Sequence, residues 1–425
     1  MKTNDPNDPN DPNDPNDPND PNDPNGPNGP NGPNGPNALL AFGVLLASYA
    51  INAMDRQLFP LLAPEVRREY GFSLEAIGFL STVFTLGMAG AGVVTGYLLT
   101  RFSRKTVLQI GIAVFSAGTA LTVLSSGFFD MLVYRAATGI GEAMQLTVLL
   151  AIAVSYFASR RGAAVGAINF FFAVGAIVGP AVGGLLIGRY QSWRVPMVVY
   201  GCLGFAVMAL VALAVKPWFS EAHAAPGDMT DRGGVLTLLN RNTLVLTAMS
   251  TIGGLVIYGY LGMYPTFLRE GLNYPPATAG TVMSIYGLGA LGSIGGGWLG
   301  DRLSPRLVLG GAFLGAAGLG YLLFHGSPLF VLQSSLSFMW GVVVSGILFV
   351  NLAACHVKAL HVSLAGRGSG IFVTSLYASA GIAGYLMGWL AGRAGWVTAG
   401  DVQISLLSLI GAALALALRS DRIAR

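Results

Sequence analysis

Four charged side chains lie inside two long apolar stretches of the chain. They are Asp55, Arg56, Arg135 and Glu142. A charge at the centre of a lipid bilayer costs at least about 2.5–3.5 kcal/mol, so such residues usually face a cavity and have a function. A carboxyl group can take up a proton, and a guanidinium can bind a carboxylate through two parallel hydrogen bonds. These residue types predict a site for protons and an anion. The alternative is a buried ion pair that only holds two helices together.

The positions of these residues along their helices favour a single cluster. Asp55 lies about 17 residues, roughly 25 Å, beyond the start of its helix, and Arg135 lies about seven residues, roughly 10 Å, into an antiparallel helix. Both residues therefore fall at a similar level. Glu142 is one heptad beyond Arg135 on nearly the same face, and Gly139 between them is expected to leave a gap. The spacing predicts a ladder from Asp55 and Arg135 to Glu142 that passes a proton or holds it beside an anion.

The composition indicates that these helices lie in a membrane. Of the 425 residues, 53% are apolar and only 10% are charged, and the mean hydropathy is +0.60. A soluble domain carries roughly 25% charged residues. Runs of about 20 apolar residues, enough to cross the hydrocarbon core, recur along nearly the whole chain. We therefore expect an all-α integral membrane protein that contacts the lipid bilayer.

Other classes of function lack their motifs in this sequence. No Gly-rich phosphate loop followed by Lys and Ser is present, which argues against an ATP-driven pump. There is no row of His and Cys with metal-ligand spacing and no nucleophile–base pair. We expect neither an enzyme nor a nucleic-acid-binding protein, and no cofactor or metal. The proton gradient suffices as the energy source.

The apolar runs predict twelve membrane-spanning helices in two sets of six. The expected spans are residues 38–62, 75–99, 106–126, 128–157, 163–188, 195–217, 242–266, 277–300, 307–325, 329–357, 368–392 and 400–418. This spacing predicts an N-terminal bundle (38–217), a cytoplasmic central loop (218–241), a C-terminal bundle (242–418) and a cytoplasmic tail (419–425).

Basic residues predict the orientation. If the N-terminus is inside, the inner loops carry most of the loop arginines and lysines, among them Arg101, Arg104, Lys105, Arg302, Arg306 and Lys358. The outer loops carry fewer, and these are partly offset by Glu65, Glu69 and Glu270. The positive-inside rule then places both termini in the cytoplasm. We expect a multi-pass protein of the cell (inner) membrane that acts as a monomer.

The first 37 residues differ in composition from the rest. They contain seven Asn-Asp-Pro and four Asn-Gly-Pro triplets. A proline at every third position blocks helix formation, and the segment has no apolar side chains to bury. We expect residues 1–37 to form a disordered, solvated tail without a role in transport. A tail that binds calcium or a partner is the alternative.

The two sets of helices share a sequence repeat. Gly96-Tyr-Leu-Leu-Thr100-Arg101-Phe-Ser-Arg104 follows the second span, and Gly297-Trp-Leu-Gly-Asp301-Arg302-Leu-Ser-Pro-Arg306 follows the eighth. The offset of 201 residues is what a duplicated six-helix unit would produce. These segments resemble the inner-loop signature of the major facilitator superfamily, Gly-x-x-x-Asp-Arg/Lys-x-Gly-Arg/Lys-Arg/Lys, and the resemblance covers about residues 38–418.

The resemblance implies a major facilitator fold with two six-helix bundles around a central site. It also implies that the signature acid latches the two halves together in the outward-open state. The second copy keeps this acid as Asp301, whereas the first has Thr100 there and Ser103 where glycine belongs. A further segment around Gly179 and Pro180 resembles the family's fifth-helix motif. Close helix packing is the simpler reading of these glycines, and a hinge at Pro180 is the alternative.

The intramembrane charges resemble one branch of this family. Asn52-Ala-Met-Asp55-Arg56 and Arg135-Ala-Ala-Thr-Gly139-Ile-Gly141-Glu142 are similar to motifs of the anion:cation symporters. The resemblance implies that Asp55 and Glu142 are protonation sites, that Arg56 contacts the carboxylate of the substrate and that Arg135 helps coupling. Spinster-type lipid transporters share the same residues.

The second set of helices offers uncharged candidates for substrate binding. Tyr258 and Tyr377 fall inside spans, and Asn351 lies in the tenth span. Each tyrosine could instead be a packed aromatic. We expect proton-coupled symport of a small organic anion, a carboxylate, by alternating access. Alternatives are a spinster-like carrier of lysolipids or other amphiphiles, a proton-antiport exporter of drugs or metabolites, and a non-transporting receptor on the same fold.

Overall fold

A computed structural model of the chain describes residues 32, 35–157, 160–222, 235–361, 364–420 and 423. Most of the repeat tail and half of the central loop lie outside these residues, so the expectations for those segments are not addressed by the structure. The described residues are almost entirely helical, and their only β-pairing is an isolated bridge between Val235 and Leu360.

The first half of the molecule, residues 36–220, contains helices α1 to α8. Their bounds are α1 Pro36–Tyr70, α2 Leu74–Thr82, α3 Phe84–Leu99, α4 Arg104–Leu121, α5 Phe128–Tyr156, α6 Arg161–Tyr190, α7 Arg194–Ala214 and α8 Pro217–Ser220, with a short η1 at Thr122–Leu124. α2 and α3 together form one span, because a single residue, Val83, separates them.

The second half, residues 241–415, contains helices α9 to α16. Their bounds are α9 Arg241–Thr266, η3 Phe267–Gly271, α10 Pro276–Ala290, α11 Ser293–Arg302, α12 Pro305–His325, α13 Phe330–Trp340, η4 Gly341–Phe349, α14 Val350–Lys358, α15 Ala365–Ala399, η6 Gly400–Leu406 and α16 Leu407–Ala415. The segments η4 and η6 are π-helical insertions within longer helices, and η3 is a π-helical turn at the C-terminal end of α9.

These helices account for twelve membrane crossings. Among the described residues, ten helices are long and apolar enough to cross a membrane, and the bent pair Pro276–Ala290 and Gly295–Arg302 makes an eleventh. One of the ten, Gly366–Ala415, is 50 residues long and breaks at Gly395, whose φ of 84° lies in the left-handed region that favours glycine. Its two legs, about 30 and about 20 residues, each suffice for one crossing.

The first helix is longer than the sequence pattern predicts. The expected span ended at residue 62. In the structure α1 continues through Pro60 and Pro64 to Tyr70, and Gly71 ends it with a φ of 69° and an N–H that donates to the Arg67 carbonyl. The prolines remove two N–H donors, but the helix axis continues. This extension carries Glu65, Arg67 and Glu69 beyond the apolar part of the helix.

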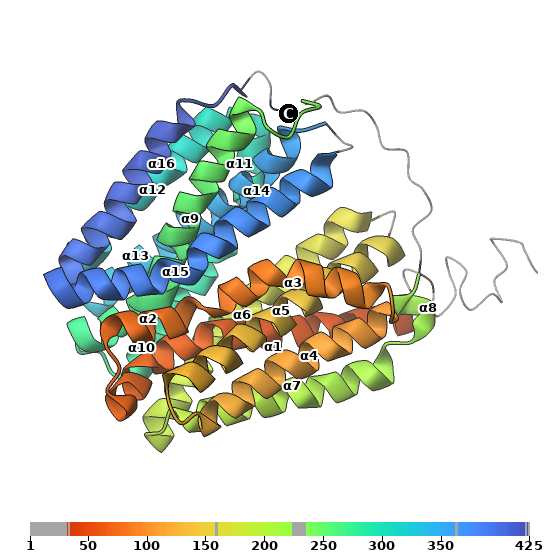
Figure 1. The fold of residues 1–425 in the computed structure, drawn as a ribbon, viewed down its shortest axis with the longest axis horizontal. Helices are drawn as coiled ribbons and strands as arrows, with labels where there is room; N and C mark the ends of the chain where they lie inside the picture. The colour runs from red at the N-terminus through yellow and green to blue at the C-terminus, as the bar shows by residue number, and fades with distance from the viewer. Residues whose placement is uncertain are drawn as a thin grey trace, which may run out of the picture.

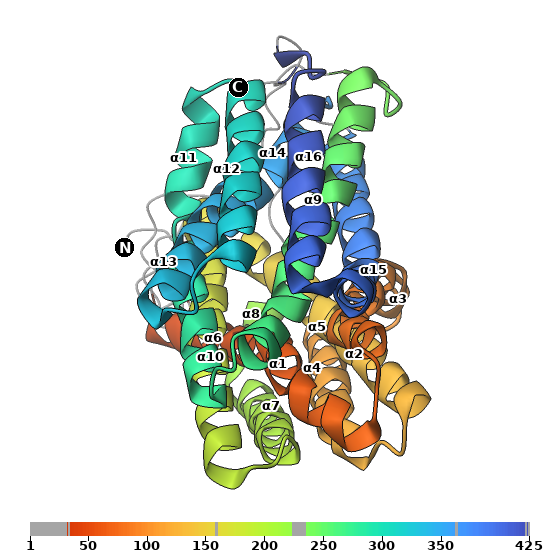
Figure 2. The ribbon, with the colours of Figure 1, turned by 90° about the vertical axis from the view of Figure 1, so that its left-hand side faces the viewer.

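The two halves lie side by side and meet mainly at one end. In Figure 1 the first half (red to yellow-green) and the second half (green to blue) approach each other near α2, α10 and α13, and they diverge toward α8 and the C-terminus. Figure 2 shows the same division from the side. The interface is formed chiefly by α6 against α10 and α2 against α15. Glycines allow the α6–α10 approach, because a Cβ at Gly184 would lie 2.8 Å from the Pro276 carbonyl oxygen.

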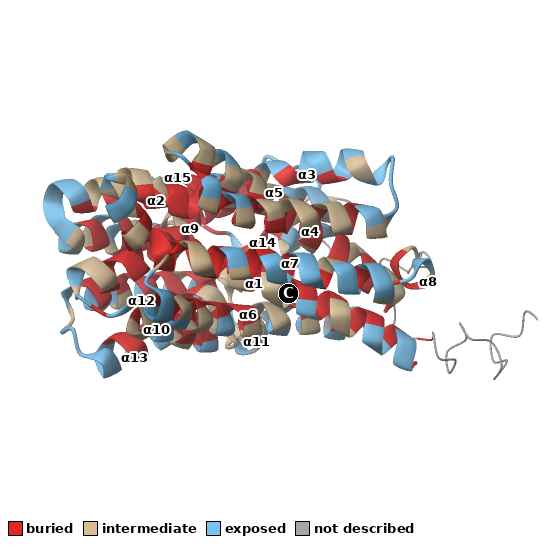
Figure 3. Ribbon diagram, turned by 90° about the horizontal axis from the view of Figure 1, so that it is seen from below, coloured by how far each residue is buried: buried red, intermediate tan, exposed pale blue. Residues whose placement is uncertain are grey.

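Burial follows this arrangement. Buried residues line the interior of the helix layers, and exposed residues lie along the outer faces (Figure 3). The exposed faces carry large apolar side chains such as Val93, Leu213 and Leu416, at 82%, 71% and 75% exposure. Single exposed apolar residues are ordinary, but faces this apolar around a whole bundle suit contact with lipid chains.

Candidate functional site

A buried ion pair joins the two predicted charge motifs. Arg56 Nε of α1 lies 2.9 Å from Glu142 Oε2 of α5, and the two side chains are 6% and 0% exposed. The guanidinium also lies 5.6 Å from the centre of the Phe172 ring of α6. Arg56 therefore has its counter-charge in its own half of the molecule, on a neighbouring helix.

Asp55 points to a different neighbour. Thr119 Oγ1 of α4 donates a 2.8 Å hydrogen bond to Asp55 Oδ2, and the carboxylate is 1% exposed. The expected ladder began with Asp55 beside Arg135. The described residues include no ion pair between these two, although both are buried in the same cluster. Asp55 and Arg56 are consecutive, so they point about 100° apart around α1, but Asp55 also interacts with Glu142, the partner of Arg56.

Arg135 sits between aromatic rings. Its guanidinium carbon lies 4.8 Å from the centre of the Phe59 ring and 5.5 Å from that of Phe84. The side chain is fully buried, and its three guanidinium nitrogens have no hydrogen-bond partner among the described residues. Cation–π contact partly compensates the lost hydration. A buried cation without direct hydrogen bonds is costly, which favours a functional role over a merely structural one.

Polar side chains without charge support the cluster from α1 and α5. Asn52 Nδ2 donates to Gln145 Oε1 at 2.8 Å and to the Glu142 carbonyl at 3.3 Å. Gln145 Nε2 donates to Ser48 Oγ at 2.9 Å. Gln145, Ser48 and Thr119 were not among the site residues predicted from the sequence. Helical spacing carried a signal for two of them, because Gln145 is three residues after Glu142 and Ser48 is four before Asn52.

Gly139 does not leave the gap that was expected. A Cβ at this position would collide with the backbone carbonyl of Phe84, so the neighbouring helix α3 already occupies the space beside the glycine. Its absence of a side chain lets α3 and α5 pack backbone to backbone. That contact brings the Phe84 ring next to Arg135.

A cavity of about 370 Å³ lies between the two halves. Arg56 is the one charged side chain among its described lining residues, and Tyr258 and Tyr377 line the opposite side. The rings of these two tyrosines meet edge to face with centroids 5.9 Å apart, and Phe84 lies 6.2 Å from Tyr258. The structure thus brings three of the four predicted substrate-binding residues to one cavity. Glu142, Asp55 and Arg135 lie behind the lining, in the first half.

Asn351 does not reach the cavity. Its Nδ2 donates to the Gly296 and Ile347 carbonyls, both at 2.9 Å, and the side chain packs against Gly300. Asn351 therefore joins α11 to α14, which is a packing role. The expectation that it binds substrate does not agree with this position.

The repeated loop motifs are each held within their own half. Lys358 Nζ donates to Asp301 Oδ1 at 2.6 Å, and Arg302 stacks 4.1 Å over Trp298. Arg104 donates to the Ala222 carbonyl at 2.8 Å, while Glu221 accepts from the first backbone N–H groups of α4.

The other predicted latch residues have no side-chain contact with the opposite half among the described residues. Gly96 and Arg101 are exposed, and Gly297 faces Val350 of its own half. A latch between the halves is therefore not formed in this conformation.

Gly179 and Pro180 lie at helix crossings. A Cβ at Gly179 would lie 2.7 Å from Met54 Cα of α1, and Tyr200 donates a 2.7 Å hydrogen bond to the Gly179 carbonyl. The Pro180 carbonyl faces Gly280 of the second half. These contacts agree with the packing interpretation of the motif.

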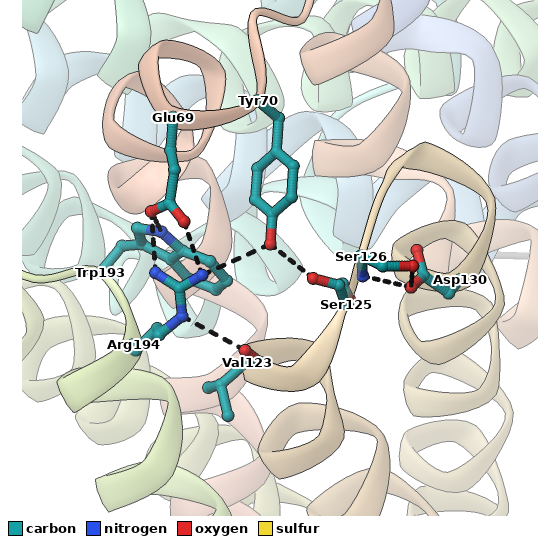
Figure 4. A network of polar contacts seen from close by, with 8 residues as sticks. All are labelled: Glu69, Tyr70, Val123, Ser125, Ser126, Asp130, Trp193 and Arg194. Atoms are coloured by element: carbon teal, nitrogen blue, oxygen red, sulfur yellow. Dashed lines mark hydrogen bonds and ion pairs between the residues drawn. The ribbon is translucent and has the colours of Figure 1, made fainter.

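Ion pairs close one end of the molecule, which we name the ion-paired end. Arg67 donates to Glu270 at 2.9 Å, and Arg269 pairs with Glu65. Each pair joins α1 of the first half to η3 of the second. α1 supplies the arginine of one pair and the glutamate of the other. A third pair, Glu69 with Arg194 at 2.6 Å, lies within the first half (Figure 4).

Comparison with known proteins agrees with this architecture. Residues 45–385 match the family model described as Major Facilitator Superfamily. The chain is 27% identical over 236 residues to Protein spinster of Drosophila melanogaster. The matched segment covers 55% of this chain and 39% of that protein. It is 26% identical over 268 residues to the hexuronate transporter of Bacillus subtilis (strain 168), covering 60% of this chain and 63% of that protein.

A solved structure shows the same fold. It is a bacterial homologue of the human lysosomal transporter spinster in an inward-facing and occupied conformation. The TM-score is 0.70 at 16% sequence identity, over 88% of this chain and 94% of that one.

Proposed function

The chain belongs to the Major Facilitator Superfamily, and within it we propose that this transporter carries a small carboxylate together with protons by alternating access. The observation that carries the proposal is the position of Arg56. Its guanidinium lines the cavity and at the same time lies 2.9 Å from the buried Glu142 carboxylate. One arginine therefore stands between an internal acid and the space where a substrate would bind.

This position couples a proton to an anion. While Glu142 is ionised, its carboxylate is the ion-pair partner of the Arg56 guanidinium. A proton on Glu142 removes that negative charge and frees the guanidinium for the carboxylate of a substrate, which it can bind through two parallel hydrogen bonds. Proton and anion then bind together, because each makes the site more favourable for the other.

The charge balance of the cluster supports one proton for each anion. Two arginines and two carboxylates, all nearly fully buried, sum to zero. A bound carboxylate adds one negative charge, and one proton restores neutrality. An uncompensated charge in this interior would be costly. In this scheme Asp55, held by Thr119, is the second proton site and Arg135 stabilises whichever acid is ionised.

Alternating access follows from the two ends of the molecule. The ion-paired end is held shut by Arg67–Glu270 and Arg269–Glu65, while the halves diverge at the opposite end (Figure 1). We assign the opposite end to the cytoplasm, because the arginine-rich loop motifs and both termini belong there under the positive-inside rule. Gly96, Arg101, Arg104, Gly297, Asp301 and Arg302 would then form the latch of the outward-open state.

We also propose how the chain is organised. Residues 38–217 and 242–418 are the two bundles that rock against each other, and residues 218–241 are the cytoplasmic loop that connects them. The rocking would take place at the α6–α10 crossing, where Pro180 faces Gly280. We place the protein as a monomer in the inner membrane of the cell.

A transport assay tests this function. Purified protein in proteoliposomes is given a panel of radiolabelled carboxylates with and without an imposed proton gradient, and protein-free vesicles correct for passive entry. Accumulation of a carboxylate that follows the proton gradient, and is lost with a protonophore, is the expected result. Accumulation against the direction of proton flow would indicate antiport, as in an exporter. Movement of lysolipids without any carboxylate would indicate a spinster-like carrier.

A further inference from the structure

The cavity changes character along its length. Arg56, Gln57, Tyr258 and Tyr377 supply polar atoms around its middle. Toward the end opposite the ion pairs, most of the lining is aliphatic or aromatic, with Tyr49 and Asn169 as polar side chains on the same stretch, and seven of these lining residues carry no polar side-chain atom. They are Leu146, Leu150, Val165, Ile168, Phe349 and Val350, together with Ala353.

Helix geometry places these apolar residues together. On α5, Leu146 and Leu150 lie about 6 and 12 Å beyond Glu142, away from the ion-paired end. On α6, which runs the other way, Ile168 and Val165 lie about 6 and 10 Å before Phe172 in the same direction. Phe349 and Val350 lie on the tenth span, which belongs to the second half. Three helices therefore present hydrocarbon to one region, which we name the apolar vestibule.

From this arrangement, and resting on the proposed function, we infer that the substrate is a monocarboxylate with a compact body that lacks hydroxyl groups. The carboxylate binds at Arg56, and the body extends into the apolar vestibule. One charged lining residue provides for one anionic group, and a second carboxylate would meet no counter-charge. A hydroxyl group placed against Leu150 or Ile168 would lose its hydrogen bonds to water and find few replacements.

The size of the cavity limits the length of the body. Its volume of about 370 Å³ lies near the lower end of the roughly 300–1,000 Å³ that small-molecule pockets enclose. This space suits a ring or a short branched chain with its carboxylate. A lysolipid with a long acyl chain would have to extend out of the cavity. Aromatic side chains at Phe84, Phe172 and Tyr258 favour a ring, because ring faces and edges pack well against one another.

Binding to the full-length protein in detergent tests this inference with matched ligands. The pair is cyclohexanecarboxylate and quinate, which share a ring and a carboxylate and differ in four ring hydroxyls. We expect cyclohexanecarboxylate to bind at least roughly tenfold more tightly, because hydroxyl desolvation is not repaid in the apolar vestibule. Equal or tighter binding of quinate overturns the substrate class while leaving an anion carrier intact. Tighter binding of a lysolipid than of either ring also overturns it.

A third ligand separates this inference from the proposed function. Cyclohexanecarboxamide has the same ring and no charge, so it should bind far more weakly than the carboxylate. If the amide binds as tightly as the carboxylate, the anion site at Arg56 fails, and the inference fails with it. If the carboxylate binds better than the amide but no better than quinate, only the inference fails.

An isosteric variant tests the location of the body. Val165→Thr with Val350→Thr keeps the shape of the vestibule and adds two hydroxyls. The preference for cyclohexanecarboxylate over quinate should fall at least about threefold. Val178→Thr, on α6 but outside the cavity lining, is the matched control and should keep the preference. An unchanged preference in the double variant would place the body elsewhere.

Discussion

Arg67 of α1 and Glu270 of η3 form a 2.9 Å ion pair across the two halves, and the adjacent pair, Arg269 with Glu65, carries the charges in the opposite order. Both pairs lie at the ion-paired end, and they are partly to mostly buried. An exposed pair contributes about 0.2–1 kcal/mol, and burial with good geometry increases this. Two pairs therefore hold the ends of the first and seventh spans together in this conformation.

Removing both pairs should open this end. In Glu65→Gln with Glu270→Gln, the ratio of open to closed molecules should rise roughly tenfold, which corresponds to about 1.4 kcal/mol. Spin labels on cysteines at Tyr190 and Ala394, in a background without the native cysteines, report the distance between the halves by pulsed electron resonance. Glu69→Gln, which breaks a pair within the first half, should leave the distances unchanged. A double variant with wild-type distances would mean that the α6–α10 and α2–α15 contacts alone close the end.

The contact of Gly139 with Phe84 predicts a severe effect from one methyl group. In Gly139→Ala the Cβ would collide with the Phe84 carbonyl, so α3 and α5 must separate. We expect a loss of several kcal/mol in stability, comparable with other overpacked sites, seen as a lower melting temperature in detergent. Gly90→Ala on α3 has open space around it and should melt at or above the wild-type temperature. Equal melting temperatures for Gly139→Ala and Gly90→Ala would contradict the observed packing.

Arg56 should be needed for binding of the carboxylate rather than for the fold alone. Arg56→Ala should weaken binding by about 2 kcal/mol or more, roughly thirtyfold. Arg56→Lys should recover little, because an ammonium cannot form the paired hydrogen bonds of a guanidinium. The measurement is ligand affinity by calorimetry, with Arg393→Ala, an exposed arginine stacked on Trp389, as the control.

The single variant also leaves Glu142 buried without its partner, which destabilises the protein. Arg56→Ala combined with Glu142→Gln removes this unpaired charge and should fold better than Arg56→Ala while still failing to bind. Normal affinity in a well-folded Arg56 variant would favour a neutral or amphiphilic cargo.

Much of the fold could be predicted from the sequence because the membrane imposes strong constraints on it. Most helix boundaries fall within a few residues of the apolar runs, and the clearest error is at α1. A proline usually argues for a helix end, yet Pro60 and Pro64 stay inside α1 because the neighbouring helices hold it in place. The break at Gly395 falls in the predicted gap between the spans 368–392 and 400–418, whereas the π-helical segments gave no recognisable signal in the sequence.

The members of the charged cluster were predictable, but their pairing was not. Intramembrane charges are rare because placing a charge in the bilayer costs free energy, and this alone marked Asp55, Arg56, Arg135 and Glu142 as candidates. Which acid faces which arginine depends on the rotation of α1 about its axis, and a helix apolar on every side does not encode that rotation. Asn351 was assigned to the cavity for the same reason, because the tenth span shows no polar stripe that would mark its inner face.

In the proposed mechanism, Glu142 exchanges a proton while Arg56 exchanges one carboxylate partner, Glu142, for another, the substrate. Glu142→Gln tests it, because glutamine has the shape and charge of the protonated acid and cannot release a proton. The variant should bind the carboxylate at least as well as the wild type, since Arg56 no longer has an internal counter-ion. It should also exchange labelled for unlabelled substrate across the membrane, since exchange requires only that the loaded carrier reorient.

The decisive measurement is therefore made on one preparation of proteoliposomes, in which exchange and gradient-driven accumulation are recorded for the wild type, Glu142→Gln and Glu75→Gln. Glu75 lies in the first turn of α2, outside the cluster, and its variant should behave as the wild type in both assays. We expect Glu142→Gln to keep exchange within about twofold and to lose accumulation driven by the proton gradient. Accumulation at the wild-type level in Glu142→Gln would contradict it and would leave the Arg56–Glu142 pair as a structural link between α1 and α5.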